Sequence, residues 1–310
     1  MKKSIGGYFE LEIHHGDEFH NNAVRLNTAR NSLRYIIKAY NIKKLYVPDY
    51  TCPVVWDAVA AENCEMAFYP IRTSFMPDMD FPENAYILYT NYFGICSDNV
   101  KTLCGKYPNL IVDNSHSFYS SREGLASFNS ARKFFGVPDG SYLFSDKIIQ
   151  DGISQDISWQ RASHLLIRTD RGPQNGYSTF QKNEEELSCN PISFISNLTL
   201  ELLRGIDYNN IAEIRRSNYL YLHEKLGEIN ECQKQLGAGD IPMVYPFIYT
   251  RKSLRTMLIE KNIFVPNYWH GQKDEQYGRT LERFLTALPI DQRYSQDDMD
   301  QIVSCLLECI

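Results

Sequence analysis

The chain has 310 residues, 43% of them hydrophobic and 13% aromatic, and it carries a formal net charge of −6 at pH 7. No apolar run approaches the roughly 20 residues that span a bilayer, the acidic balance disfavours a nucleic-acid partner, and the N-terminal segment lacks the apolar middle of a secretory signal. We therefore expect a cytoplasmic protein that has no membrane or nucleic-acid partner and can form one large and one smaller domain.

Eight cysteines lie along the chain without a CxxC pair and without histidines at the spacing of a zinc site. This pattern predicts free thiols and no metal site. Because neither a metal nor a nucleic acid is indicated, the expected partner is a small molecule or another protein.

Short apolar segments alternate with helical patterns in the first half of the chain. Apolar residues recur at helical spacing over residues 28–40, and the apolar segment 45–48 follows. The alternation continues with helices predicted over residues 54–62 and 99–106, and with strands predicted over residues 66–71, 85–94, 110–113 and 140–144. Such alternation predicts a mostly parallel sheet covered by helices on both faces, which is a three-layer α/β/α arrangement.

The pattern changes after residue 144. Residues 146–160 and 168–186 are polar and rich in turn-forming residues, which predicts a mobile loop region. A long helical pattern runs from residue 191 to about 235, and the remaining predicted elements are a strand over 244–249, a helix over 253–262, a strand over 263–269 and a helix over 295–310 with Ser295 as its N-cap. We expect a large domain over residues 1–190 and a small C-terminal α/β domain over residues 191–310.

The most informative stretch contains an acid and a lysine twenty residues apart. Asp113 ends the apolar strand LIVD, and Lys133 opens the glycine-bearing loop KFFGVPDG. A carboxylate at the carboxyl end of a buried strand can keep a pyridine nitrogen protonated, and a partly desolvated lysine amine can bond covalently to an aldehyde. Taken singly, Asp113 could be a turn residue or a helix N-cap, and Lys133 could be a solvated lysine on a loop. Together they indicate pyridoxal phosphate.

Other residues could complete such a site. The sequence LNTARNSLRYII offers polar groups at a helix start, where Arg30 could contact a phosphate or point to water. Ser130 could reach the same phosphate, and His116 could contact the phenolic oxygen of the cofactor or be a buried histidine satisfied by backbone. One of residues 50–52 could cover the ring. No GxGxxG or GxxxxGK[ST] motif is present, which disfavours a dinucleotide or a nucleoside triphosphate.

In the order of its segments the chain resembles the DegT/DnrJ/EryC1/StrS sugar aminotransferases, whose architecture is fold type I of the pyridoxal phosphate-dependent transferases. The phosphate-binding helix start of that family is similar to TARNSL, and its Pro-x-x-Thr strand end is similar to VPDYTCPVVWDAV. The segment with the pyridine-binding aspartate matches IVDNSHSF, the loop that begins at the Schiff-base lysine matches KFFGVPDGS, and the closing strand and helix match FLTALPIDQRYSQDDMDQIVSCL.

The resemblance implies a role for each residue. Lys133 would be the Schiff-base lysine and proton carrier, Asp113 the partner of the ring nitrogen, and Ser130 a phosphate ligand. The resemblance places the other four around the cofactor: Arg30 and Asn31 near the phosphate, His116 where the family commonly has a glutamine, and Cys52 where it has the aromatic residue that stacks on the ring. It also implies a homodimer that transfers an amino group from glutamate to a keto sugar nucleotide in surface polysaccharide or related biosynthesis.

Departures from the family leave alternatives open. Bulkier residues replace the Gly-Thr pair of the phosphate loop, and the chain is shorter than the family norm. Both departures are compatible with a degenerate, catalytically inactive aminotransferase fold that serves as a binding or regulatory module. A third activity, dehydration of a sugar, normally goes with a histidine at the position of Lys133. Contacts to the sugar are expected around residues 168–177, and the polar region after residue 144 could close over the site.

Overall fold

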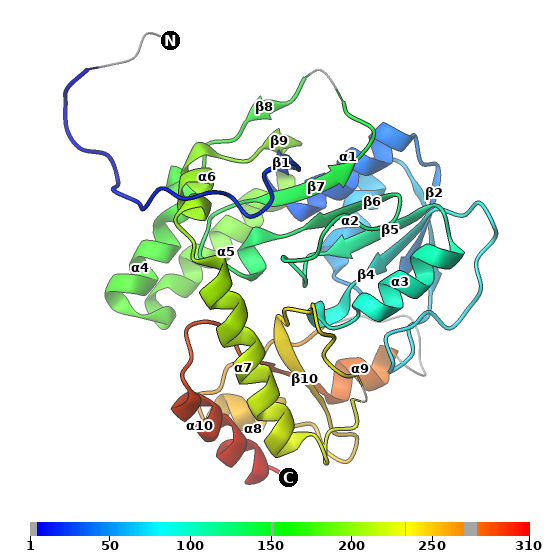
Figure 1. Ribbon diagram of the computed structural model, residues 1–310, viewed down its shortest axis with the longest axis vertical. Coiled ribbons are helices and arrows are strands. Elements are labelled where there is room, and N and C mark those ends of the chain that lie inside the picture. The colour runs from blue at the N-terminus through cyan, green and yellow to red at the C-terminus, as the bar shows by residue number, and fades with distance from the viewer. Residues whose placement is uncertain (1–4, 150–151, 233, 270–277) are drawn as a thin grey trace.

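The computed structural model describes residues 5–149, 152–232, 234–269 and 278–310. A nine-stranded sheet forms the upper part of Figure 1, in the order β3-β2-β4-β5-β6-β7-β1-β9-β8, and a two-stranded sheet of β10 and β11 lies below it. The strands are β1 (Val24–Leu26), β2 (Lys44–Pro48), β3 (Glu65–Tyr69), β4 (Ile87–Thr90), β5 (Leu110–Asn114), β6 (Ala126–Asn129), β7 (Ser141–Ser145), β8 (Ser154–Gln155), β9 (Ser193–Phe194), β10 (Val244–Ile248) and β11 (Leu285–Pro289).

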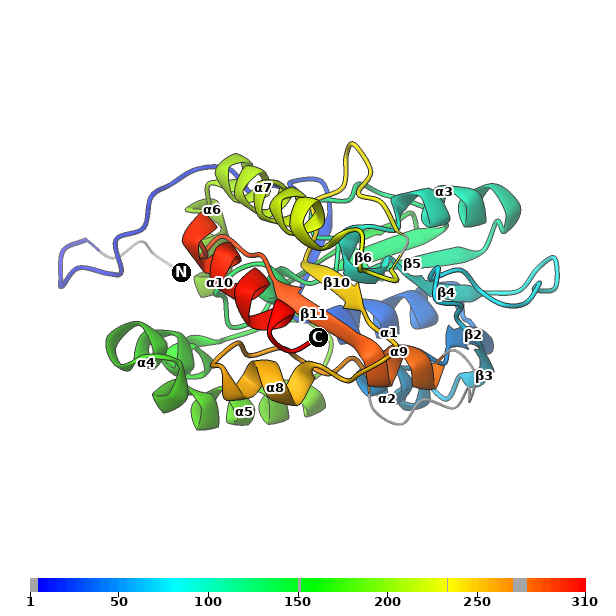
Figure 2. The same cartoon turned by 90° about the horizontal axis from the view of Figure 1, so that it is seen from below.

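The large sheet is mostly parallel, as predicted. Strands β2 to β6 all run in one direction, whereas β7 is antiparallel to both β6 and β1. The helices are α1 (Ala29–Tyr40), α2 (Pro53–Ala61), α3 (Ser97–Lys106), α4 (Ser163–Arg171), α5 (Pro173–Cys189), α6 (Asn197–Arg204), α7 (Tyr208–Leu226), α8 (Arg255–Glu260), α9 (Gly278–Phe284) and α10 (Gln296–Leu307). Figure 2 shows α7, α8 and α10 around the ribbon of β10 and β11.

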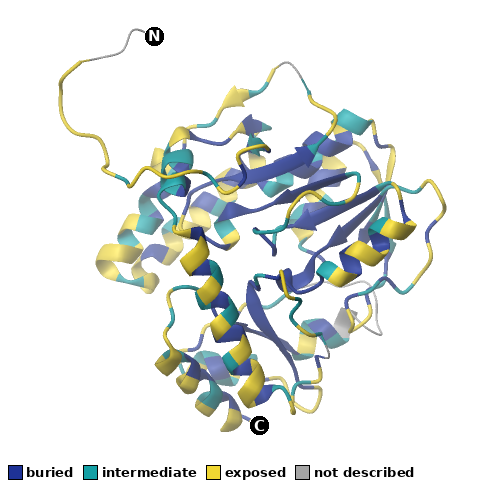
Figure 3. Cartoon of the chain, viewed as in Figure 1, coloured by how far each residue is buried: buried dark blue, intermediate teal, exposed yellow. Residues whose placement is uncertain are grey.

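Successive residues of the central strands pack into two separate hydrophobic cores. Leu88 of β4 and Ile111 of β5 pack with α1 and α2, whereas their neighbours Tyr89 and Val112 pack with α3 and the C-terminal elements. Because side chains alternate between the two faces of a strand, these cores lie on opposite faces of the sheet. The central strands β4, β5 and β6 are accordingly buried along their length (Figure 3), and the predicted α/β/α layering is confirmed.

The carboxyl ends of the parallel strands are aligned at one edge of the sheet. Thr90, the last residue of β4, is the register partner of Asp113 in β5, and Asn114 is the register partner of Asn129, the last residue of β6. Ser130 follows β6, and Lys133 lies at the end of the short 3-10 turn over residues 131–133 that comes next. The fold therefore brings the acid and the lysine to the same edge.

The prediction of a loop region after residue 144 is wrong over much of that segment. Residues 163–189 form the helices α4 and α5, which are joined at Gly172 and pack as a hairpin. In α5 only Gly176, Asn183 and Leu187 are buried, so the apolar periodicity that identifies a helix is nearly absent. Gly172, with φ of 81°, and the proline that follows it at the first position of α5 were signals of a helix boundary.

Two further expectations about the C-terminal part need correction. The long helical pattern from residue 191 is divided into β9, α6 and α7, and Ser196 and Asp207 are the N-caps of the two helices. Residues 263–269, expected as a strand, pair with no strand among the described residues. Instead, β11 pairs with β10. The helix with Ser295 as its N-cap is confirmed as α10, which has a capping box with Asp298.

Strand β9 lies beyond the predicted domain boundary at residue 190, yet it pairs with β1 in the large sheet. A division into a large and a small domain stays a prediction, and we propose that the second domain begins after α6. In the part of the chain that the structure describes, no helix has the length and apolar character needed to cross a membrane.

Gly124, in the connection between β5 and β6, cannot accept a side chain without strain. Its φ is +63°, and a Cβ would lie 2.5 Å from the main-chain oxygen of Leu110. We expect Gly124→Ala to lower the free energy of unfolding by about 2 kcal/mol. A Cβ built on Gly105 in α3 would have no atom within 4 Å. Gly105→Ala should therefore raise the free energy of unfolding by about 0.5 kcal/mol. Urea unfolding of both variants tests this, and similar changes in the two would contradict it.

Candidate active site

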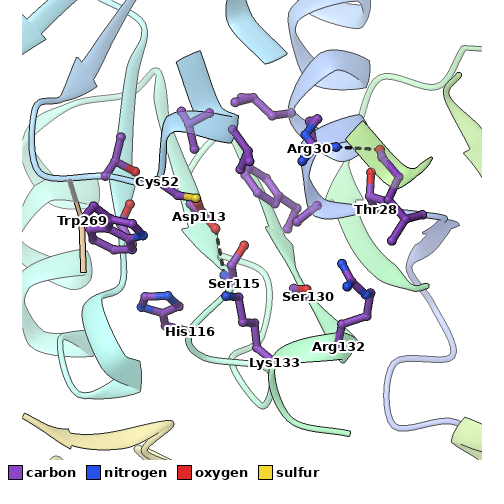
Figure 4. Close-up of a pocket in the computed structure, with 18 of the residues that line it drawn as sticks. Thr28, Arg30, Cys52, Asp113, Ser115, His116, Ser130, Arg132, Lys133 and Trp269 are labelled. Carbon is purple, nitrogen blue, oxygen red and sulfur yellow. Dashed lines mark hydrogen bonds between the residues drawn. The ribbon is translucent and has the colours of Figure 1, made fainter. Parts of the chain in front are cut away.

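Six of the seven site residues that the sequence indicates line one cleft at the carboxyl edge of the sheet: Arg30, Cys52, Asp113, His116, Ser130 and Lys133. They come from the start of α1, the strand ends and the turn after β6. Figure 4 shows Arg30, Arg132 and Thr28 on one side of the cleft, Asp113, His116 and Trp269 on the other, and Lys133 between the two groups.

Asn31, the seventh residue, does not line the cleft. Its side-chain amide donates to Asn27 Oδ1 at 2.9 Å and to the carbonyl of Pro191 at 2.8 Å, and its backbone N–H donates to Thr28 Oγ1 at 3.1 Å. The predicted contact between this side chain and a phosphate is therefore not supported. Asn31 instead connects the start of α1 by hydrogen bonds to the segment before β9.

Asp113 supplies a buried carboxylate to the cleft. Its side chain is only 6% exposed, and Oδ1 accepts a hydrogen bond from the backbone N–H of Ser115 at 2.8 Å. Burial raises the pKa of this carboxyl, while the hydrogen bonds from Ser115 and the charge of Lys133 oppose the rise. A cation placed against Asp113 would stabilise its ionised form.

The Lys133 side chain is open to solvent through the cleft, yet protein surrounds its amine on the other sides. This partial desolvation lowers the pKa of the Lys133 amine, and the guanidinium of Arg132 lowers it further. Cys52 and Asp113 act in the opposite direction. The net lowering increases the share of neutral amine, which is the form that attacks a carbonyl carbon.

Cationic groups gather where α1 begins. Thr28 is the N-cap of this helix, and Arg30 lies in its first turn with Nη1 donating to the carbonyl of Leu187 at 2.6 Å. The Nε of Arg30 is buried and has no acceptor among the described residues. Arg132 forms an ion pair with Glu184 of α5, and burial lowers the pKa of Arg132 to about 10, so it stays charged at neutral pH. A helix start with these cations suits a phosphate group.

His116 is held between two aromatic rings. Its imidazole stacks on Phe93, with ring centres 5.5 Å apart, and on Trp269, with ring centres 5.4 Å apart. Burial lowers the pKa of His116 well below its ordinary value, and Nδ1 lies 3.3 Å from the backbone N–H of Phe93. Because that N–H can only donate, Nδ1 accepts and the proton of the neutral ring lies on Nε2. His116 therefore offers a neutral hydrogen-bond donor.

Residues of the C-terminal part hold the turn that carries the lysine. The carbonyl of Phe134 accepts hydrogen bonds from Gln292 Nε2 at 2.7 Å and from Arg215 Nη2 at 3.4 Å, and the guanidinium of Arg215 lies 4.5 Å from the centre of the Phe134 ring. Since Phe134 follows Lys133 directly, these contacts fix the position of the amine relative to the cleft.

The residues of the cleft that sequence reasoning missed include Thr90, Arg132, Glu184 and Trp269. Thr90 ends β4 beside Asp113, so the argument from strand ends could have found it. Its Oγ1 is buried and has no hydrogen-bond partner among the described residues. Glu184 lies in the segment expected as a loop, and no local signal connects Trp269 with the sheet edge.

Comparisons with known proteins establish the fold. No family model matches the sequence, and no curated protein matches it. Among solved structures, a DegT DnrJ EryC1 StrS aminotransferase from Brucella abortus is 15% identical, with 92% of this chain and 85% of that chain covered and a TM-score of 0.61. The PLP form of Spr1654 from Streptococcus pneumoniae is 13% identical, with 93% and 88% covered and a TM-score of 0.64.

A third structure is the GDP-4-keto-6-deoxymannose-3-dehydratase ColD with bound GDP-perosamine. It is 14% identical, with 92% of this chain and 88% of that chain covered and a TM-score of 0.62. The predicted architecture is confirmed by these three likenesses: the chain has the fold of the DegT/DnrJ/EryC1/StrS aminotransferases, which is fold type I of the pyridoxal phosphate-dependent transferases.

Proposed function

We propose that the protein is a pyridoxal phosphate-dependent aminotransferase of the DegT/DnrJ/EryC1/StrS family. It transfers an amino group from glutamate to a keto group on a nucleotide-linked sugar, in surface polysaccharide or related biosynthesis, and acts in the cytoplasm as a homodimer. The observation that carries the proposal is the presence of Lys133 and Asp113 in one cleft beside a cationic helix start. The shared fold with known enzymes of this kind adds to it.

The residues present fit this cofactor. Asp113 suits the ring nitrogen and Lys133 the aldehyde carbon, while Thr28, Arg30, Ser130 and Arg132 suit the phosphate. The orphaned Nε of Arg30 and Oγ1 of Thr90 would gain partners from a polar ligand in the cleft.

When bound, the cofactor would supply an electron sink for the amino donor. Lys133 would hold the cofactor through its amine and would act as the general base and acid that carries the proton of the α carbon. Asp113 would keep the ring nitrogen protonated throughout, and the Nε2–H of His116 would orient the phenolic oxygen. Trp269 and His116 form an aromatic wall at this end of the cleft, and Cys52 lies beside it.

A half-reaction tests the proposal. Purified protein mixed with pyridoxal phosphate should turn yellow, and glutamate added without an acceptor should change the visible spectrum and yield one equivalent of 2-oxoglutarate. A protein that stays colourless would instead favour the inactive binding module. Sugar dehydration, the activity that the name of ColD describes, is disfavoured because Lys133 occupies the position where a histidine is expected for that reaction.

The pH dependence of cofactor attachment should report the electrostatics of Lys133. Attachment needs the neutral amine, so its rate should rise with pH and level off below the ordinary lysine pKa of 10.5. Arg132→Gln removes a nearby cation and should shift the profile to higher pH. Stopped-flow absorbance with pyridoxal, which lacks the phosphate, isolates this effect from phosphate binding. The matched control is Arg171→Gln, since Arg171 does not line the cleft. An unchanged profile in Arg132→Gln would contradict the assignment.

A further inference from the structure

The cofactor cleft contains a row of three side chains that come from neighbouring strands of the large sheet. Thr90 of β4 is the register partner of Asp113 of β5, and Asp113 is in turn the register partner of Phe128 of β6. All three residues line the cleft. Side chains of register partners project from the same face of a sheet, and the strands lie about 4.8 Å apart. Thr90 and Phe128 therefore flank Asp113 on opposite sides.

Thr90 carries a hydroxyl that the described part of the protein leaves unsatisfied. This residue is 2% exposed, and its Oγ1 has no hydrogen-bond partner among the described residues. The carboxylate of Asp113, by contrast, accepts the backbone N–H of Ser115. A buried hydroxyl without a partner costs stability, and a valine of nearly the same shape would not. A threonine at this position therefore points to a ligand that uses the hydroxyl.

The groups that suit a phosphate lie on one side of Asp113. Ser130 and Arg132 follow β6 in the chain. Thr28 and Arg30 belong to the start of α1, and Figure 4 shows them on the same side of the cleft as Arg132. A phosphate bound by these groups would lie on the β6 side of the carboxylate.

Uncharged hydrogen-bond donors lie on the other side of Asp113. Thr90 ends β4, and His116 lies against the segment that follows β4, since its Nδ1 accepts the backbone N–H of Phe93 at 3.3 Å. The Nε2–H of His116 is the donor that remains on the ring. Figure 4 shows His116 on the side of the cleft opposite the arginines. The β4 side of the carboxylate thus offers a hydroxyl and an imidazole N–H.

We propose that the Thr90 hydroxyl donates a hydrogen bond to the phenolic oxygen of pyridoxal phosphate and shares this oxygen with His116. This inference rests on the proposed function. In the cofactor, the phosphate arm and the phenolic oxygen are attached on opposite sides of the line that joins the ring nitrogen to the aldehyde carbon. When the nitrogen pairs with Asp113 and the phosphate lies on the β6 side, the phenolic oxygen lies on the β4 side, where its lone pairs can accept both donors.

The ring also carries a methyl group on the β4 side, between the nitrogen and the phenolic oxygen, and this group is the alternative neighbour of Thr90. A methyl group would leave the hydroxyl unpaired and would pack equally well against valine. A bond to the oxygen gives the hydroxyl its partner, and it favours the ionised form of that oxygen. The two contacts therefore predict different effects when only the hydroxyl of Thr90 is removed.

Absorbance titration with pyridoxal phosphate and with 3-deoxypyridoxal phosphate, which lacks the phenolic oxygen, tests the inference. Thr90→Val should weaken the binding of pyridoxal phosphate about five- to tenfold, the usual effect of losing one hydrogen bond. It should change the affinity for the 3-deoxy analogue less than about twofold. Thr90→Ser retains the hydroxyl and should restore the preference for pyridoxal phosphate. Thr286→Val is the matched control, because Thr286 is a buried strand residue that does not line the cleft, and it should leave both affinities unchanged.

Thermal unfolding without cofactor gives a second measurement on the same variant. Because Thr90→Val removes an unpaired buried hydroxyl, it should raise the melting temperature by about 1 to 3 °C. The same substitution is thus expected to stabilise the protein without cofactor and to weaken the binding of the cofactor. A structural role for the hydroxyl would lower the melting temperature instead.

Three results would overturn the inference: a Thr90→Val protein less stable than the wild type, an unchanged affinity for pyridoxal phosphate, or equal weakening for pyridoxal phosphate and its 3-deoxy analogue. The last two would refute the contact alone, since the protein still binds the cofactor. A wild-type protein that binds neither compound refutes the proposed function and the contact with it. A wild-type protein whose affinity depends on Thr90, but which yields no 2-oxoglutarate from glutamate, refutes the aminotransferase and leaves the contact supported.

Discussion

Lys133→Ala should abolish covalent attachment of pyridoxal phosphate and lower the rate of the glutamate half-reaction by at least about 10³-fold, because the proposed function makes this side chain both the anchor and the proton carrier. No other lysine lines the cleft among the described residues, so none can replace it. Borohydride reduction of the wild-type protein, followed by peptide mass spectrometry, should place the cofactor on the peptide that contains Lys133. The variant should yield no labelled peptide.

Lys101→Ala serves as the control for this experiment. Lys101 lies exposed on α3 and does not line the cleft, so its removal should leave the yellow colour and the rate unchanged. A label on a different lysine of the wild-type protein, or a Lys133→Ala variant that keeps the visible absorbance, would remove the basis of the proposed chemistry.

Asp113→Asn should lower the same rate by about 10²- to 10³-fold, the usual cost of losing one electrostatic partner of the reacting group. The amide oxygen of asparagine can still accept the N–H of Ser115, so the local fold stays intact while the negative charge is lost. Cofactor binding should persist, since the phosphate and Lys133 contacts remain. Asp98→Asn, on the surface of α3, controls for the loss of a charge.

Two further measurements separate the chemical role of Asp113 from a structural one. A cofactor methylated at the ring nitrogen carries a permanent positive charge and should restore part of the rate to Asp113→Asn. Without cofactor, the raised pKa of Asp113 means that the folded state holds its proton more tightly than the unfolded state does. The stability that Asp113 contributes should therefore be lost as pH rises above the unfolded-state pKa of 3.8, so the difference in stability between the wild type and Asp113→Asn should change over this pH range. An unchanged rate in Asp113→Asn would refute the chemical role.

Local sequence was enough to predict the alternating strands and to predict that Lys133, Asp113 and Ser130 lie together in one cleft, because these features depend on short-range pattern and on the rule that ligands bind at strand ends. Asn31 shows the limit of that reasoning. Its position at a helix start was correct, but the side chain turns to Asn27 and Pro191, and the second of these partners is 160 residues away.

The wall of the cleft could not be predicted in the same way. Trp269 and Arg215 reach the site only because the C-terminal part packs against the turn after Lys133. The helices α4 and α5 carry too few buried apolar residues to show a helical period. Their contribution to the site depends on charge and on contacts between distant segments, which a pattern along the chain does not record.

The contacts of Gln292 and Arg215 with Phe134 have a consequence for engineering. The N-terminal segment ending near residue 190 contains every candidate cofactor ligand named from sequence, yet the turn with its reactive amine is tied down by residues beyond position 200. If the chain were split into two polypeptides, the first piece would present that amine on a turn that lacks the hydrogen bonds from Gln292 and Arg215. We expect the amine to bond efficiently to an aldehyde only after the second piece is added back. Addition of the second fragment could therefore be used to turn on the activity of the first.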